Sequence, residues 1–253
     1  MGETRMSAQP GPREPSVLLV GGTGRTGRRV LEQLLDRDVP VCAIVRSPGK
    51  LPPAVAEDPG LTVVSADLLS LGDDELRAHV RGRTAVISCL GHVLDLRGVF
   101  GPPRDLVTQA TQRLCAAIGA QEPAQPIRFI LMSSVSVNDP RGPDIHRGAG
   151  QRAALAALRG VLPPARDNQR AADLLRVQVG TSNPLVEWVV VRPDSLVEGD
   201  ISAYTLHEGI VASLFAPDQT TMANVAHFMC ELATDPSIWQ DWRGTMPVIT
   251  NPR

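Results

Sequence analysis

The sequence contains few aromatic residues and no long hydrophobic run. Phe, Trp and Tyr make up 3% of the 253 residues, so the chain offers no row of rings on which single-stranded nucleic acid would stack. No apolar stretch approaches the roughly 20 residues that span a bilayer. Residues Met1–Pro15 are polar and lack the apolar segment of a secretory signal. We therefore expect a cytoplasmic protein that binds neither nucleic acid nor membranes.

The chain also lacks an excess of either charge. It carries 25 Lys and Arg against 27 Asp and Glu, for a formal net charge of -2, which gives no long-range attraction for a polyanion. A small-molecule substrate is the better expectation. The four cysteines lie far apart in apolar segments, without the close pairing of zinc or redox sites, so we expect no metal and predict reduced, buried thiols at Cys42, Cys89, Cys115 and Cys230.

Short apolar segments alternate with longer amphipathic ones along most of the chain. This pattern predicts an α/β fold, a Rossmann-type doubly wound parallel sheet with helices on both faces. The predicted strands are Ser16–Gly21, Val39–Val45, Leu61–Ser65, Ala85–Cys89, Arg128–Ser133 and Val186–Val191. The predicted helices between them are Arg25–Leu35, Asp73–Val80, Arg104–Ile118 and Asp167–Val179. We expect a disordered tail over residues 1–15 and one domain over residues 16–253, as a monomer or homodimer.

Two regions depart from this alternation. Residues 136–164 are rich in Pro, Gly and Arg and enclose one short predicted helix, Gln151–Leu158. Because this is too long for an ordinary connection, we interpret it as an insertion that covers a site. Its arginines are predicted to be mostly solvated, with closure over an acidic substrate as the alternative: Arg141, Arg147 and Arg152. A small C-terminal substrate-side region follows the sixth strand, with predicted elements Met222–Ala233 (helix), Ser237–Trp242 (turn) and Met246–Thr250 (strand).

Three glycines at a spacing of three join the first predicted strand to the first helix. Gly21 ends the strand in a tight turn, Gly24 removes a side chain where the backbone must approach a pyrophosphate, and Gly27 lets the helix pack close to the sheet. The helix then presents free N–H groups to the phosphates. The loop predicts a dinucleotide site, to which Thr23, Arg25 and Thr26 also belong.

The end of the second strand favours NADP(H) over NAD(H). An acidic residue commonly holds the ribose hydroxyls at this place in NAD-binding proteins, but this chain has Arg46. A guanidinium can bind a 2′-phosphate and stack on adenine, with Ser47 and Arg25 nearby; a solvated surface arginine is the alternative. Asp67, which precedes Leu68 after the third strand, is either an acceptor for the adenine amino group or the cap of the next segment.

The chain resembles the atypical short-chain dehydrogenase/reductases of the NAD(P)H-binding, NmrA-like group, and within it the flavin/biliverdin-IXβ reductases. The likeness runs from Ser16 to Asn251 and rests on residues 21–27, 45–46, 66–67, 88–91, 132–134, 191–193 and 246–249. It implies a cofactor site that also includes Cys89, Leu90, Gly91, Ser133 and Pro193. His92 is then either beside the cofactor or a loop histidine bonded to backbone or water.

The same resemblance implies three residues on the substrate side. Ser134 matches a serine that faces nicotinamide and substrate, although capping a turn is the alternative. Asn168 stands at the position of a substrate-side polar residue. Tyr204 lies in the loop beyond the last central strand, where it either stacks on the acceptor or packs as a rim or core tyrosine.

The catalytic pair of ordinary short-chain dehydrogenases is missing. In that pair, Tyr-x-x-x-Lys, the lysine lowers the pKa of the phenol that protonates a carbonyl oxygen. Residues Ala165–Gln169 stand in its place, and no lysine follows the single tyrosine four residues later. The resemblance therefore implies hydride transfer from NADPH to an electron-poor conjugated acceptor that is flavin-, quinone- or tetrapyrrole-like.

Two other functions are compatible with the absence of the Tyr-x-x-x-Lys pair. One is an NmrA-like redox sensor that binds NADP(H) without turnover. The other is a redox-neutral cyclase, epimerase or isomerase of a biosynthetic pathway, in which NADP is retained as scaffold. Its candidate acid-base groups are Ser134, His92, His146, Asp167 and Tyr204.

Overall fold

The computed structural model describes residues 13–92, 101–140, 148, 150, 153, 156–157, 160–212 and 217–252. Most of the predicted tail lies outside the described residues, and so does most of the predicted helix Gln151–Leu158. His146 and the insertion arginines Arg141, Arg147 and Arg152 lie outside them as well.

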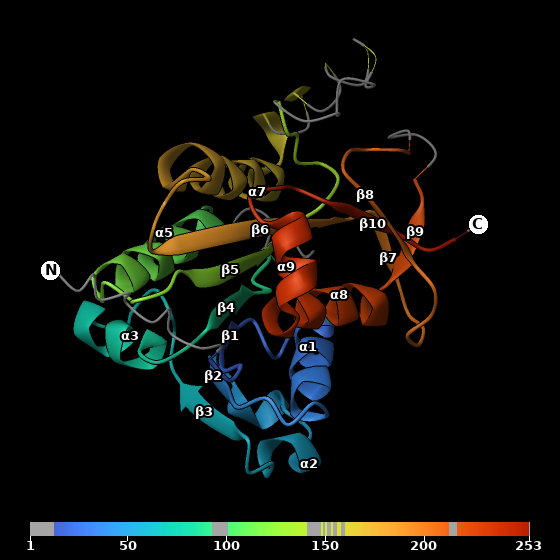
Figure 1. Ribbon diagram of the computed structural model, residues 1–253. Helices are drawn as coiled ribbons and strands as arrows, with labels where there is room; N and C mark the ends of the chain where they lie inside the picture. Colours follow the sequence, from blue (N-terminus) through green and yellow to red (C-terminus); the bar gives the residue numbers. More distant parts are fainter. Residues whose placement is uncertain are drawn as a thin grey trace, which may run out of the picture.

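One sheet of eight strands runs through the molecule (Figure 1). Its order is β3-β2-β1-β4-β5-β6-β10-β8, and every neighbouring pair is parallel except β10 and β8. The predicted doubly wound sheet is thus confirmed, with an antiparallel strand added at one edge. The strands are β1 (Val17–Val20), β2 (Val41–Val45), β3 (Leu61–Ser65), β4 (Ala85–Ser88), β5 (Ile127–Met132), β6 (Val186–Pro193), β8 (Thr205–His207) and β10 (Val248–Thr250).

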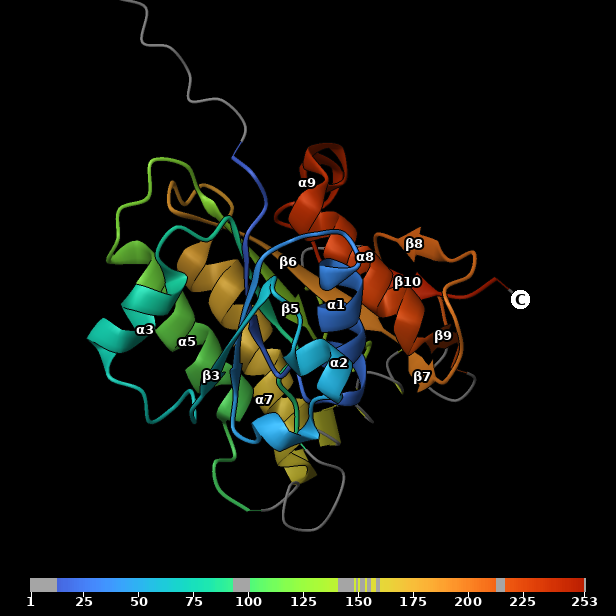
Figure 2. The ribbon, with the colours of Figure 1, turned by 90° about the horizontal axis from the view of Figure 1, so that it is seen from below.

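Helices cover both faces of the sheet, as Figure 2 shows from below. The central strands β1 and β4 are buried at every residue, which is why they read as continuous apolar runs. One face carries α3 (Asp73–Val80), α5 (Leu106–Gly119) and α7 (Pro163–Asp173); the other carries α1 (Arg25–Leu35), α8 (Met222–Thr234) and α9 (Pro236–Trp242). No helix among the described residues is long and apolar enough to cross a membrane.

The helix after the insertion differs from its prediction at its beginning. The structure starts α7 at Pro163, four residues before the predicted Asp167, and continues it as a π-helical segment, η3 (Leu174–Val179). Pro163 and Pro164 are typical of a break in a helical pattern. Proline is nevertheless favoured in the first turn of a helix, because the N–H groups there have no hydrogen-bond partner within the helix. The last two residues of the predicted insertion thus belong to α7. At its other end Val137 is fully buried in the core.

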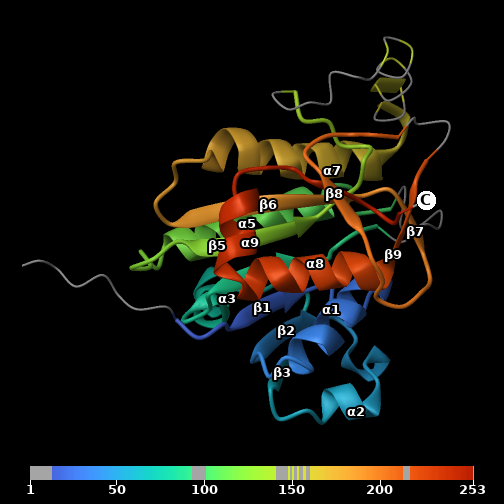
Figure 3. The same ribbon diagram turned by 45° about the vertical axis from the view of Figure 1, so that its right-hand side comes forward.

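The C-terminal region holds elements that the sequence pattern did not indicate. The predicted turn at Ser237–Trp242 is the helix α9, whose start Asp235 caps through its side chain. Short strands β7 (Ser195–Val197) and β9 (Gln219–Thr221) form a separate parallel pair, seen in Figure 3. In this pair β9 contacts β10. The connection after β2 contains η1 (Pro48–Lys50) and α2 (Pro53–Ala56). Strands of three residues are too short for an alternation signal.

Arg192 joins this region to the main sheet from a fully buried position on β6. Its guanidinium donates to the carbonyl oxygens of Met246 (2.6 Å), Val137 (3.1 Å) and Glu208 (3.4 Å). A buried charge is tolerated when such bonds replace its hydration. One side chain thus connects the segment directly before β10, the turn after β5 and the loop after β8.

We expect Arg192→Met to lower the free energy of unfolding by about 3 kcal/mol, because three buried carbonyls lose a charged donor. Urea unfolding followed by circular dichroism measures this change. Arg243→Met is the matched control, since Arg243 is half exposed and pairs with Glu187 at the surface. Equal stability of the two variants would contradict the role given to Arg192.

Candidate functional site

A cleft of about 210 Å³ lies where the strands β1 to β4 end. Open α/β sheets bind their ligands at this edge, beyond the carboxyl ends of the strands. Nine residues predicted to bind the cofactor line the cleft: Gly21, Thr23, Gly24, Arg46, Asp67, Leu68, Cys89, Leu90 and Gly91. The sequence analysis missed seven others: Val20, Ile44, Val45, Lys50, Ala66, Pro103 and Leu106.

The glycine turn is packed so tightly that side chains do not fit. Gly21 has φ +81°, and a Cβ there would lie 2.6 Å from the carbonyl carbon of Cys89. A Cβ on Gly27 would lie 2.2 Å from the carbonyl oxygen of Gly21. The turn closes through a bond from the Gly24 N–H to that same oxygen (3.0 Å). The mechanical roles predicted for the first and third glycines therefore have a direct basis in this packing.

Two basic side chains line the part of the cleft beside the end of β2. Arg46 follows β2, and Lys50 ends the short helix η1 four residues later. No acidic residue stands directly after β2. Asp67, on the next strand end, accepts from the Leu69 N–H (2.9 Å) and so caps a turn while lining the cleft. Lys50 was not foreseen because only the fold of η1 brings it beside Arg46.

Arg25 is not among the cleft-lining residues, although it was predicted to assist the 2′-phosphate. Its guanidinium donates to Glu198, 2.9 Å away, and Arg29 donates to the other carboxylate oxygen. These pairs hold the pKa of Glu198 below its usual value, chiefly through the hydrogen bond from Arg25. Thr26 and Gly27 are buried beneath the turn, and Ser47 precedes η1 without a side-chain cap bond.

The end of β4 packs against the glycine turn and forms one wall of the cleft, through Cys89, Leu90 and Gly91. Burial raises the pKa of the Cys89 thiol, so this group is uncharged at neutral pH. Burial raises the pKa of Cys115 and of Cys230 to about 12. All four cysteines are free, as predicted, but only Cys42 and Cys230 are fully buried.

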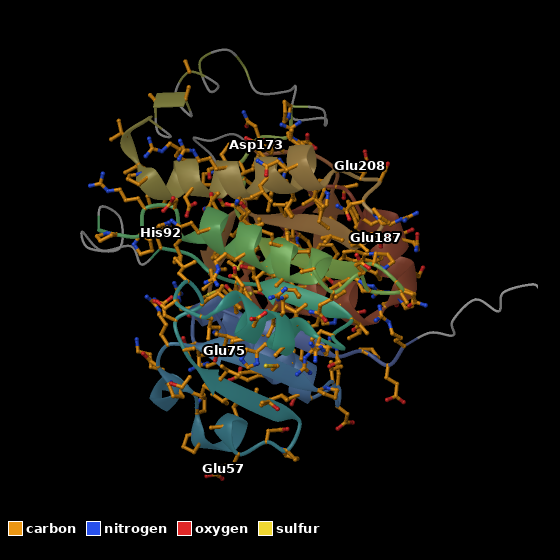
Figure 4. The ribbon with its side chains drawn as sticks, turned by 90° about the vertical axis from the view of Figure 1, so that its left-hand side faces the viewer. Glu57, Glu75, His92, Asp173, Glu187 and Glu208 are labelled. Carbon is orange, nitrogen blue, oxygen red and sulfur yellow. The ribbon has the colours of Figure 1, made fainter. Side chains whose placement is uncertain are left out.

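His92, directly after this wall, makes a hydrogen bond with Asp167 of α7. The Nε2 atom lies 2.8 Å from Oδ2 of Asp167, and 4% of the histidine side chain is exposed. Figure 4 shows His92 beside the beginning of α5 and below α7. Neither of the two open interpretations of His92 included this partner. The pairing brings together two of the acid-base candidates, 75 residues apart in the sequence.

Three serines lie at the carboxyl ends of neighbouring strands: Ser88 ends β4, and Ser133 and Ser134 follow β5. The hydroxyls of Ser88 and Ser133 are buried and make no hydrogen bond in the described structure. Ser134 lies 2.7 Å from Ser136 Oγ and accepts from the Ser136 N–H (3.3 Å), which fits the turn-capping alternative. Pro193 ends β6, and its carbonyl accepts from Val135.

The other two predicted substrate-side residues do not line the cleft. Asn168 is half-buried on α7. The hydroxyl of Tyr204 lies 3.0 Å from Nδ1 of His227 on α8, and the ring packs against Phe228. Burial raises the pKa of Tyr204. The geometry thus favours the rim or core interpretation of this tyrosine.

Taken together, the cleft presents main-chain N–H groups at its centre, cations at one end and a wall of small residues along β4. This arrangement can hold a dinucleotide: the start of α1 faces the pyrophosphate position, and Arg46 with Lys50 faces the adenosine side. A Cβ would fill the space at Gly21 and Gly27, so the cradle depends on these glycines. The described residues that line the cleft include no His, Tyr or Glu as proton donor.

Comparison with known proteins agrees with this geometry. The sequence model of the NAD(P)H-binding family matches residues 21–236. An uncharacterised chloroplastic protein of Arabidopsis thaliana is 29% identical over 133 residues, which cover 52% of this chain and 45% of that relative. The match therefore spans less than half of the relative's length.

Two solved structures illustrate the likeness in fold. A putative NADH-flavin reductase from Streptococcus pneumoniae has a TM-score of 0.62 at 18% identity, with 94% of this chain and 100% of that chain covered. An anaerobilin reductase from Escherichia coli has a TM-score of 0.65 at 19% identity, with 94% and 97% covered. The Rossmann-type fold expected from the sequence is shared with both.

We expect Gly27→Ala to weaken NADPH binding by more than about tenfold, because the new Cβ forces α1 and its phosphate-facing amides away from the turn. Isothermal titration calorimetry measures the affinity. Gly119→Ala is the matched control, since a Cβ on Gly119 meets nothing within 4 Å and alanine favours the helix by about 0.5–1 kcal/mol. Unchanged affinity in the Gly27 variant would show that the turn is not the phosphate cradle.

Proposed function

The chain belongs to the NAD(P)H-binding family, and on that premise we propose that it is an NADPH-dependent reductase of conjugated planar acceptors. The acceptor would be flavin-, quinone- or tetrapyrrole-like. One observation carries the proposal: the cleft combines a glycine turn with two cations, while the chain lacks the Tyr-x-x-x-Lys pair and no His, Tyr or Glu is among the described residues that line the cleft. The similar structures titled as a flavin reductase and an anaerobilin reductase support the same class of acceptor.

The residues of this chain have distinct tasks in the proposed reaction. The amides after Gly21 hold the pyrophosphate, while Arg46 and Lys50 hold the 2′-phosphate. Leu90 and Gly91 give the nicotinamide a flat, apolar wall, which orients the ring and excludes water. When bound, the reduced nicotinamide supplies the hydride. The proton then comes from solvent, which suffices for acceptors whose reduced form is stabilised by conjugation.

The first test is turnover. We expect purified protein to oxidise NADPH, seen as loss of nicotinamide absorbance, when riboflavin, menadione or biliverdin is added. The Gly27→Ala variant should lose this activity because it lacks the cradle, whereas Gly119→Ala should keep it. Tight NADPH binding with unchanged absorbance for every acceptor would sink the reductase proposal and favour the redox sensor. A substrate converted with bound NADP unchanged would favour the redox-neutral enzyme.

The second test concerns the choice of cofactor. We expect Arg46→Ala and Lys50→Ala each to weaken NADPH binding about tenfold, or by about 1.4 kcal/mol, while NADH binding changes little. The reason is that only the 2′-phosphate needs these two cations. Arg77→Ala, which removes a cation paired with Asp74 on α3, serves as the control. Equal losses for NADPH and NADH would contradict a 2′-phosphate site.

A further inference from the structure

Asp167 is a buried carboxylate that the proposed reaction does not use directly. Its side chain has no exposed surface and lies on α7, where ordinary short-chain dehydrogenases carry their catalytic pair. A buried charge is costly unless hydrogen bonds replace its water. The hydrogen-bond partners of this carboxylate therefore indicate its structural role.

Four donors surround the two carboxylate oxygens. Oδ2 accepts from the Val107 N–H (2.8 Å) and faces His92 Nε2 (2.8 Å). Oδ1 accepts from the Thr108 N–H (3.0 Å) and from the Thr108 hydroxyl (2.6 Å). Val107 and Thr108 are the second and third residues of α5, whose first N–H groups have no partner within the helix. The residue before α5, Asp105, makes no side-chain cap bond, so a residue of another helix caps α5.

The donors adjoin the walls of the cleft. Val107 follows Leu106, which lines the cleft, and His92 follows Gly91, which lines it from the end of β4. One carboxylate therefore holds both segments at a fixed separation without touching the cleft itself. Two residues further along α7, Gln169 binds the loop after β5 in the same manner, through the N–H (2.9 Å) and the carbonyl (3.1 Å) of Asn138.

We propose that Asp167 is a positioning residue for the cofactor cleft. It acts through His92 on the wall formed by Leu90 and Gly91, and through the start of α5 on the wall formed by Leu106. The inference rests on the proposed function only in assuming that this cleft receives NADPH. Helix α7 thus provides a fixed hydrogen-bond acceptor at the place where ordinary short-chain dehydrogenases carry their catalytic pair.

The test compares NADPH affinity in Asp167→Asn, His92→Gln and the double variant, with fluorescence of the bound nucleotide as the readout. A carboxamide keeps the size of the side chain but turns an N–H₂ toward one pair of donors. We expect Asp167→Asn to weaken binding about tenfold. The double variant should bind no more weakly than Asp167→Asn, because both changes break the same connection. Thr108→Val, which keeps the backbone bonds, should have a smaller effect.

Two controls separate positioning from general loss of stability. Trp239→Phe removes a buried donor to Glu187 on the opposite face of the sheet, and should lower the urea midpoint while leaving NADPH affinity unchanged. The proposal would be overturned if Asp167→Asn destabilised the fold without weakening NADPH binding. Fully additive effects of Asp167→Asn and His92→Gln on NADPH binding would overturn it as well.

Hydrogen exchange keeps the test independent of the proposed function. In Asp167→Asn the amides of residues 106–108 and of residues 90–92 should exchange faster together, with the rest of the sheet unaffected. Faster exchange at only one of the two segments would refute the inference even if the protein bound no dinucleotide. Conversely, NADPH binding without reduction of any acceptor would refute the reductase proposal and leave the positioning role standing.

Discussion

The contact between the glycine turn and the end of β4 is the constraint on which the rest of the cleft depends. Gly27 stands where any Cβ would overlap the carbonyl oxygen of Gly21, and Gly21 stands against the backbone of Cys89. Protein interiors tolerate such approach only where side chains are absent. This packing sets the direction of α1, brings its first amides to the strand ends, and makes the end of β4 the adjoining wall of the cleft. Small residues in one turn thereby determine the shape of a site built from four strands.

The local sequence pattern was sufficient to predict several helices and strands of the fold around the glycine turn. The bounds of α1, α3 and β3 agree with the prediction at both ends, because strong periodicity and clear breaks mark them. Lys50 and Glu198 were missed because each reaches its place through tertiary packing. Asp167 was named only as one acid-base candidate among several: its partners lie 59 to 75 residues away, a separation on which spacing carries no information. Short strands such as β7 and β9 were missed for a different reason, because three residues are too few to show an alternating pattern.

The charges around the cleft show how a nearly neutral chain creates a site for an anion. Arg25, Arg28 and Arg29 lie near the beginning of α1, where the helix dipole disfavours cations. Glu198 compensates by binding two of them, so the helix start is not overloaded with positive charge. Arg46 and Lys50 lie on the other side of the glycine turn. The net charge of -2 therefore conceals a local arrangement in which cations face the places where phosphates are expected.

The residues that α7 carries in this chain affect which reactions the site can catalyse. A tyrosine with a lowered pKa would need an accessible lysine nearby and a path to the acceptor oxygen. Here the corresponding stretch instead contains Asp167, whose acceptor capacity is taken by α5 and His92, and Gln169, which is bound to Asn138. These bonds rigidify the walls, which favours the orientation of two stacked rings over proton delivery. Such a site is poorly suited to reducing a simple ketone, because the alkoxide that forms must be protonated as the hydride arrives. A conjugated acceptor spreads the incoming charge over its own ring system, so its reduction depends mainly on the geometry that this helix maintains.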